Sequence, residues 1–197
     1  MFAKDWKKDL FTIPNVLSLF RLVLIPIYVV LYLQAEVPED YFLAAGILAV
    51  SCLTDLIDGK IARHFHMISN TGKILDPLAD KATQFTLIVC LTIQLRYPVL
   101  ILLTCLFVVK EVFQLVAGFL ILRKGKILKG ALIAGKISTA VLFVSLIVLI
   151  LFPTIGKTAL YAIVGVDILV LLIAFASYIR VYFTPSPMIQ SIDDPLE

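Results

Sequence analysis

The chain has 197 residues, of which 61% are apolar and only 16% are charged, and its formal net charge is +3. Such a composition excludes an ordinary soluble globular domain. It predicts an integral membrane protein built as one compact helical unit, and we expect no nucleic-acid partner.

The first twelve residues predict a short helix that lies on the membrane surface. Phe2, Trp6 and Leu10 recur every four residues, and the lysines lie mostly elsewhere around the helix. Such an amphipathic helix suits an anionic leaflet, and we expect it over residues 1–12. A frayed basic terminus is the alternative. The interspersed acids argue against a signal peptide.

Six apolar stretches follow, each long enough to cross a bilayer as a helix. They cover residues 16–34, 41–62, 76–95, 99–122, 131–152 and 158–182. Pro26 predicts a kink in the first helix, and Pro77 is expected in the first turn of the third, where its missing N–H is tolerated. We therefore expect an all-α integral membrane fold with a six-helix domain over residues 13–183 and a flexible cytoplasmic tail over residues 184–197.

Basic residues alternate between the loops. They concentrate before the first span, in residues 60–73 and in residues 123–129, whereas the opposite loops hold only Arg96 and Lys157. By the positive-inside rule, both termini and the loops after the second and fourth spans face the cytoplasm of a cell-membrane protein.

Four carboxylates lie close together around the loop after the second span. They are Asp55, Asp58, Asp76 and Asp80. Carboxylates at membrane depth are unfavourable and normally functional. Because oxygen ligands favour Mg²⁺ or Mn²⁺ over zinc, we expect a site for such ions, two of which could bridge the phosphates of a substrate.

The first half of this segment has helical phase. At 100° per residue, Asp55 and Asp58 fall on one helix face together with Arg63. Gly59 and Ala62 leave that face bare between the charged groups, which allows a bulky phosphorylated ligand to approach closely. Arg63 adds a cation with phosphate-matching geometry.

The second half places Asp76 and Asp80 one helical turn apart. The loop over residues 65–71 can fold this face back against the first one. Acids that collect Mg²⁺ beside an arginine suit a diphosphate substrate, and one carboxylate can take a proton from an incoming hydroxyl. The residues alone do not choose between Asp76 and Asp80 as this base.

The whole pattern, D-x2-D-G-x2-A-R-x8-G-x3-D-x3-D, resembles the signature of the CDP-alcohol phosphatidyltransferases. The resemblance implies the fold of that family and attack by an alcohol on the phosphatidyl phosphorus of CDP-diacylglycerol, with release of CMP in phospholipid biosynthesis. It implies that Asp55, Asp58 and Asp76 bind metal. Asp80 would be the general base and would also touch the second metal ion.

The same resemblance implies a binding site for the CDP-lipid. Its contacts would be Asn15, Ser18, Asp55, Gly59, Ala62, Arg63, Ser69 and Gly72. The segment T-I-P-N-V-L-S-L-F-R (12–21) is similar to the start of the first span in this family. Taken alone, Asn15 and Ser18 could equally be ordinary helix caps. Arg21 could pair with a motif acid or with a lipid phosphate.

The acceptor alcohol is implied by further patterns. P-N-x-L-S/T-x-x-R, L-D-P-L-A-D-K (75–81) and G-K-x-x-T (135–139) are most similar to phosphatidylglycerophosphate synthases, which implies glycerol 3-phosphate. Candidate acceptor contacts are Lys110, Arg123 and Lys136. Lys110–Glu111 stands where an Arg–Glu pair is expected, which keeps cardiolipin synthase, with phosphatidylglycerol as acceptor, as the alternative. Lys110 and Glu111 could instead only neutralise each other, and Lys136 could be a snorkelling lysine.

Two other classes of protein fit less well. A Mg²⁺ transporter needs polar groups through the membrane thickness, but the last three spans offer only Glu111 and Asp167 as carboxylates. A non-catalytic lipid-binding scaffold would not need the full set of acids. No partner for Asp167 is evident from the sequence. Small residues spaced four apart, Gly130 to Ala134 and Ala131 to Gly135, could serve internal packing or a homodimer.

Overall fold

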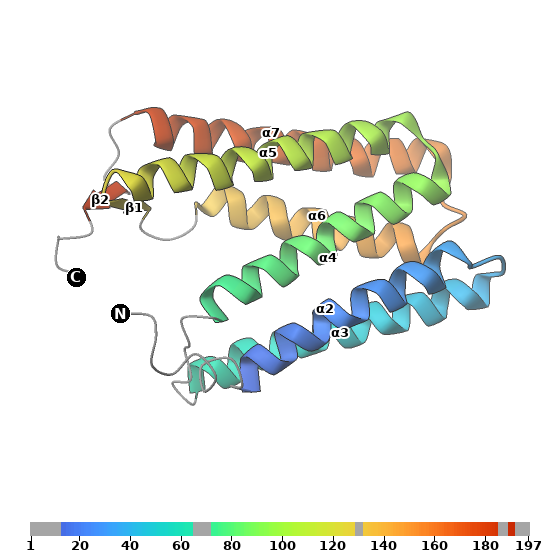
Figure 1. Cartoon of the computed structure of the whole chain (residues 1–197). Helices are drawn as coiled ribbons and strands as arrows, with labels where there is room; N and C mark the ends of the chain where they lie inside the picture. The colour runs from blue at the N-terminus through green and yellow to red at the C-terminus, as the bar shows by residue number, and fades with distance from the viewer. Residues whose placement is uncertain (1–12, 65–71, 129–131, 185–188, 192–197) are drawn as a thin grey trace. The chain divides into compact units, whose positions relative to one another are not determined.

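The computed structural model describes residues 13–64, 72–128, 132–184 and 189–191. Six long helices occupy the six apolar stretches, which confirms the predicted helical architecture (Figure 1). They are α2 (Ile13–Leu33), α3 (Pro38–His64), α4 (Gly72–Leu95), α5 (Pro98–Arg123), α6 (Ile133–Leu151) and α7 (Lys157–Phe183). The predicted surface helix over residues 1–12 and the loop over residues 65–71 lie outside the described residues.

Four of these helices are long and apolar enough to cross a membrane. The candidate spans are Asn15–Leu33, Pro98–Arg123, Ile133–Leu151 and Lys157–Phe183. Large apolar side chains on them are widely exposed, such as Leu115 at 74% and Phe183 at 79%, which suits a surrounding of lipid better than water. The chain is therefore a multi-pass membrane protein. Helices α3 and α4 carry the motif acids, and their crossing of the membrane stays a prediction.

One expectation about α4 is wrong. The helix begins at Gly72, four residues before the predicted start, so Pro77 lies in its second turn and not in its first. The backbone carbonyl of Lys73 therefore loses the N–H that would normally donate to it from position 77. A single missing bond does not end the helix, and α2 likewise runs without a break through Pro26.

Two short strands were not anticipated. β1 (Lys126–Leu128) pairs antiparallel with β2 (Ile189–Ser191), so that Lys126 lies opposite Ser191 and Leu128 opposite Ile189. Part of the expected flexible tail is therefore hydrogen-bonded to the segment after α5. The pairing joins two stretches that are far apart in the chain.

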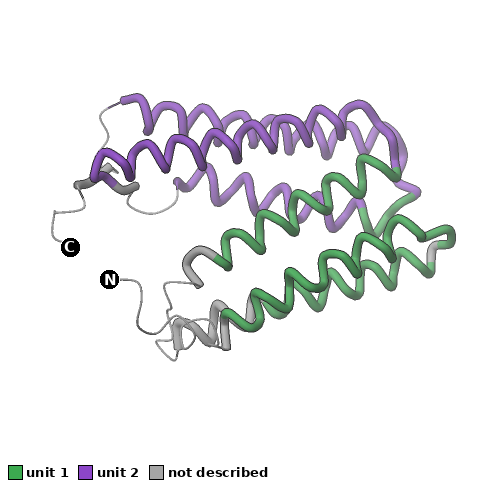
Figure 2. The backbone as a smooth tube through the Cα atoms, viewed as in Figure 1, with its two compact units in different colours: residues 1–94, 150–153 green, residues 95–149, 154–197 purple. Residues whose placement is uncertain are grey.

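The chain divides into two compact units, drawn in Figure 2. The first comprises residues 1–94 and 150–153 and contains α2, α3 and α4. Three tyrosines pack against one another in the core of this unit, at the end of the helices away from the motif. Tyr28 stacks on Tyr32 with ring centroids 5.5 Å apart, Tyr32 meets Tyr41 edge-on at 5.5 Å, and Gln94 Nε2 donates a 2.7 Å hydrogen bond to the Tyr41 hydroxyl. These contacts join all three helices of the unit.

The second unit comprises residues 95–149 and 154–197 and contains α5, most of α6, α7 and the two strands. Aromatic rings join α5 to α7, with Phe113 at 5.1 Å from Phe175 between ring centroids. Gly135 on α6 is buried directly against the Tyr178 hydroxyl of α7. One glycine of the small-residue pattern thus serves packing within the chain. The expectation of one six-helix domain over residues 13–183 stays a prediction.

Replacing Gly135 by alanine is expected to destabilise the protein by about 1–3 kcal/mol, because the new methyl group would overlap the Tyr178 ring and hydroxyl. Thermal unfolding in detergent would measure the loss. The double variant Gly135→Ala/Tyr178→Phe removes the closest clashing atom and should regain part of the stability. Equal unfolding temperatures for the wild type and Gly135→Ala would contradict the close approach.

Candidate functional site

The acids of the second half of the motif lie on α4. Asp76 and Asp80 are one helical turn apart, as the spacing predicts, and both are partly buried. Ala79, between them in the sequence, is fully buried. The helical backbone therefore holds the two carboxylates about 6 Å apart along the helix axis.

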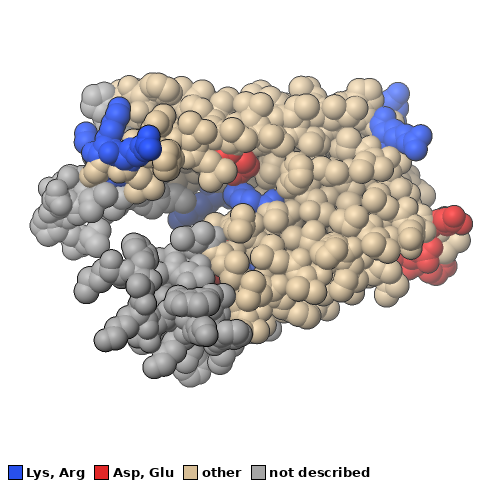
Figure 3. Space-filling model, in the orientation of Figure 1, with Lys and Arg blue, Asp and Glu red and all other residues tan. Residues whose placement is uncertain are grey.

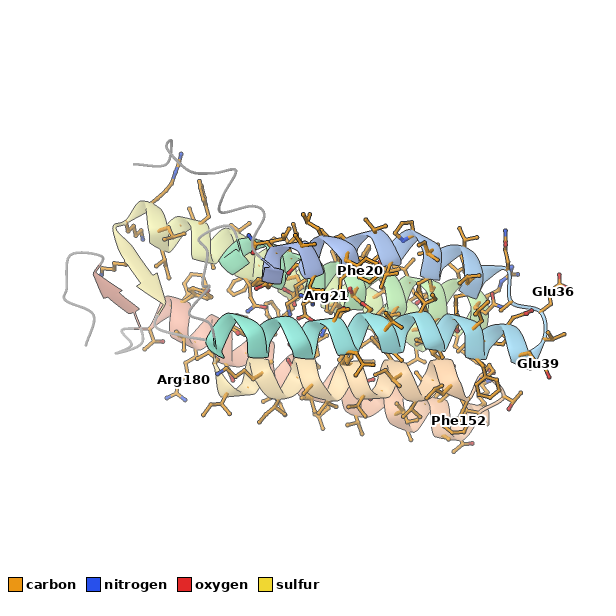
Figure 4. All side chains as sticks on the ribbon, turned by 90° about the horizontal axis from the view of Figure 1, so that it is seen from below. Phe20, Arg21, Glu36, Glu39, Phe152 and Arg180 are labelled. Carbon is orange, nitrogen blue, oxygen red and sulfur yellow. The ribbon has the colours of Figure 1, made fainter. Side chains whose placement is uncertain are left out.

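Helix α2 brings polar groups to Asp76. Ser18 Oγ donates a short hydrogen bond to the Asp76 carboxylate, and Arg21 Nη2 donates to Ser18 Oγ over 3.4 Å. Asn15 and Ser18 are completely buried and Arg21 is 3% exposed, whereas the neighbouring Phe20 is 43% exposed (Figure 4). The start of the first span thus faces an acid of the motif, and Arg21 reaches that acid through Ser18.

Replacing Ser18 by alanine is expected to weaken the site about ten- to a hundredfold, because a hydrogen bond to a charged carboxylate is lost. The affinity of the purified protein for Mn²⁺ would measure the loss. Ser177→Ala is the matched control, since Ser177 Oγ donates only to the backbone carbonyl of Ile173 in α7. Equal affinities of both variants would contradict a role for Ser18.

The first half of the motif lies on α3, which runs as a continuous helix to His64. The structure thus confirms the helical backbone on which the prediction of one shared helix face for Asp55 and Asp58 depends. The predicted residues on it are Asp55, Asp58, Gly59, Ala62 and Arg63. Their side chains lie outside the described residues, as do Ser69 in the loop and the surroundings of Gly72, where α4 begins.

The described residues give a partial test of the predicted metal site. Among the side chains that the structure describes, no group of three or more Asp, Glu, His or Cys residues could hold a metal ion. Asp76 and Asp80 nevertheless supply carboxylate oxygens of the kind that Mg²⁺ and Mn²⁺ prefer. The contribution of Asp55 and Asp58 lies outside this test, so the shared metal site stays a prediction.

Lys110, the first candidate acceptor contact, lies in the middle of α5. Its ammonium group forms a 2.7 Å ion pair with Glu111 and is 5.9 Å from the ring centroid of Tyr178. Lys110 is 3% exposed and Glu111 18%. The neutralising pair considered for these residues therefore exists, and Tyr178 provides a second contact for the cation.

The other two candidates occupy different places. Arg123 ends α5 and lies 4.9 Å from the Phe119 ring centroid, in a group of exposed cations with Lys124 and Lys126 (Figure 3). Arg123 is thirteen residues from Lys110, or about 20 Å along the helix, so one small acceptor cannot contact both. Lys136 is exposed near the start of α6, next to the glycine that contacts Tyr178.

Sequence reasoning missed two buried polar residues, Tyr178 and Gln84, and noticed a third, Asp167, without finding its partner. Tyr178 contacts both Lys110 and Gly135, which no local pattern could indicate. Gln84 is 1% exposed, and its amide has no hydrogen-bond partner among the described residues. Gln84 follows Asp80 by four residues and therefore lies on the same face of the helix, which could have indicated it from the sequence. Asp167 is 2% exposed, and the hydroxyl of Ser145 on α6 is a neighbour of its carboxylate.

Comparison with known proteins gives one family. Residues 11–179 match the family model for CDP-alcohol phosphatidyltransferase. A CDP-diacylglycerol–glycerol-3-phosphate 3-phosphatidyltransferase of Aquifex aeolicus is 34% identical over 68% of this chain and 71% of the relative. A cardiolipin synthase (CMP-forming) of Streptomyces coelicolor is 36% identical over 58% of this chain, and one of Homo sapiens 40% identical over 55%. The chain spans 53% and 34% of these two synthases, so about half of their length or less.

Proposed function

Because the chain belongs to the CDP-alcohol phosphatidyltransferase family, we propose that it transfers the phosphatidyl group of CDP-diacylglycerol to an alcohol and releases CMP. The observation that carries the proposal is the hydrogen bond from Ser18 to Asp76, with Arg21 donating in turn to Ser18. It joins the polar start of the first span to the acid motif at one place. A buried cation and a buried hydroxyl beside a carboxylate suit a ligand with bound metal and phosphate.

The acids have distinct roles in this proposal. Asp55, Asp58 and Asp76 would hold the divalent metal ion that members of this family use. When bound, that ion would neutralise charge on the diphosphate. Asp80 would also touch a second such ion and would take the proton from the attacking hydroxyl.

The remaining motif residues bind the nucleotide-activated lipid. Arg63 compensates phosphate charge, and Gly59 and Ala62 leave room for the substrate. The other contacts are Asn15, Ser18, Ser69 and Gly72. The acids and both termini face the cytoplasmic side of the cell membrane, as the alternating basic loops support.

We propose glycerol 3-phosphate as the acceptor. The sequence patterns at residues 75–81 and 135–139 support it, and so does the printed name of the Aquifex relative. Lys110, which lies over the ring of Tyr178, and Lys136, which follows Gly135 in the sequence, are the cations that would bind its phosphate. Arg123 would act separately, at the end of α5.

Phosphatidylglycerol is the second candidate acceptor. Several relatives are named cardiolipin synthases, and Lys110 lacks the bidentate geometry of an arginine. The two candidates share chemistry, because both present the primary hydroxyl of a glycerol whose far carbon carries a phosphate. They differ in charge and in the attached diacylglycerol.

One assay tests the function and the acceptor together. Purified protein in mixed micelles with CDP-diacylglycerol and Mg²⁺ should release CMP when glycerol 3-phosphate is added, and a chelator should stop the release. CMP release with phosphatidylglycerol alone would assign the protein to the second candidate. No release of CMP with either acceptor would overturn the proposed activity.

A further inference from the structure

Gln84 is a buried polar side chain of the first unit that the proposed chemistry does not use. It lies on α4 and is 1% exposed, and neither its amide nitrogen nor its amide oxygen has a hydrogen-bond partner among the described residues. Thr83 beside it, by contrast, donates to the carbonyl of Ala79 over 2.9 Å. Because a buried amide without partners is unfavourable, Gln84 suits a ligand that can both donate and accept a hydrogen bond, such as a hydroxyl group.

Gln84 lies next to the proposed general base on the same helix. It follows Asp80 by four residues, which is about 6 Å along the helix axis and about 40° around it. Side chains of a helix lean towards its N-terminus, so the side chain of Gln84 leans towards Asp80. Ile88 and Leu91, which follow on the same face, are apolar and fully buried. Gln84 is therefore the last polar group on this face of α4, directly beyond Asp80.

Asp80 separates Gln84 from the acid that α2 contacts. Asp76 precedes Asp80 by four residues, and its carboxylate accepts the hydrogen bond from Ser18. Each step of four residues turns about 40° around α4 in the same direction, so Gln84 lies about 80° from Asp76. In phosphoryl transfer the attacking and leaving oxygens lie on opposite sides of the phosphorus. A diphosphate held at Asp76 and Ser18 therefore leaves the side of Gln84 to the attacking alcohol.

We propose that the Gln84 amide binds the hydroxyl group next to the attacking one on the acceptor alcohol. Glycerol 3-phosphate and the head group of phosphatidylglycerol both carry a secondary hydroxyl beside the primary hydroxyl that attacks. With the primary hydroxyl at Asp80, the secondary hydroxyl donates to the amide oxygen of Gln84 or accepts from its nitrogen. This inference rests on the proposed function and adds a residue that selects a glycerol head over an alcohol without the second hydroxyl.

The test compares glycerol 3-phosphate with 3-hydroxypropyl phosphate, which keeps the primary hydroxyl and the phosphate but lacks the secondary hydroxyl. Gln84→Met keeps the length of the side chain and removes the amide. In the CMP-release assay it should raise the KM for glycerol 3-phosphate about three- to tenfold, as expected for one lost hydrogen bond. The KM values for 3-hydroxypropyl phosphate and for CDP-diacylglycerol should stay unchanged.

Gln94→Met is the matched control on the same helix. Gln94 lies ten residues beyond Gln84, or about 15 Å along α4, and its amide donates to the Tyr41 hydroxyl. This variant loses a hydrogen bond of the fold but should keep the wild-type KM for both acceptors. Gln84→Met should unfold at the temperature of the wild type or above it, because it removes a buried amide that has no partner among the described residues.

Each other outcome has a defined meaning. Equal effects of Gln84→Met on both acceptors, or no effect on either, would overturn the proposal. If only phosphatidylglycerol supports CMP release, the comparison is made with phosphatidyl-1,3-propanediol, which lacks the same secondary hydroxyl, and the same results are expected. Wild-type protein that releases no CMP with either acceptor would refute the proposed function itself, which differs from a missing effect of Gln84→Met.

Discussion

Replacing Asp80 by asparagine is expected to lower the rate of CMP release about 10²- to 10⁴-fold, the usual contribution of a positioned general base. Asparagine has nearly the same shape but cannot accept the proton of the attacking hydroxyl. Asp80 lies partly buried on a helix that continues for four turns beyond it, so the fold should tolerate the change. The measurement is the initial rate at saturating CDP-diacylglycerol and acceptor.

Two comparisons make this result specific. Glu36→Gln removes a carboxylate from an exposed position between α2 and α3, far along the chain from the motif, and should leave the rate unchanged. Asp76→Asn should lower the affinity for Mg²⁺ as well as the rate, because Asp76 is proposed only as a metal ligand. Wild-type turnover by Asp80→Asn would show that the base lies elsewhere.

Replacing Lys110 by methionine is expected to raise the KM for the acceptor about ten- to a hundredfold, since a charged contact to the acceptor's phosphate would be lost. The variant should also be less stable, because Glu111 loses the partner that lies 2.7 Å away. KM values for acceptor and CDP-lipid, measured beside thermal unfolding, would separate the two effects.

The double variant Lys110→Met/Glu111→Gln separates the effect on acceptor binding from the effect on stability. Because it removes both charges of the buried pair, it should be more stable than Lys110→Met, but its KM for the acceptor should stay raised. Arg123→Met is the matched control on the same helix, at an exposed position about 20 Å away. If the double variant recovers the wild-type KM, Lys110 serves only to neutralise Glu111.

The sequence predicted those features of the fold that depend on local composition. Six apolar stretches became six helices, because hydropathy over about 20 residues is a property of the segment itself. The pairing of β1 with β2 could not be predicted, because it joins two stretches that are distant in the sequence and ordinary in composition. The early start of α4 was missed because the proline at position 77 was given too much weight as a boundary.

In the site, too, the features that depend on spacing within one helix could be predicted, and those that depend on packing between helices could not. The turn between Asp76 and Asp80 follows from helical spacing alone. The partner of Ser18, Asp76 on α4, could not be predicted in this way, because spacing within α2 does not tell which neighbouring helix its polar face meets. The contact of Tyr178 with both Lys110 and Gly135 likewise arises only when α5, α6 and α7 pack together. The choice of acceptor depends on such contacts, which explains why the residues left it open.

The hydrogen bond from Ser18 to Asp76 joins residues that are 58 positions apart, and this separation affects how the protein enters the membrane. At about 5–20 residues per second, a ribosome needs about 3 to 12 s to make the intervening chain. During that interval the newly made α2 holds Ser18 and Arg21 without their acid. The translocation machinery or the lipid headgroups must shelter this polar face until α4 emerges.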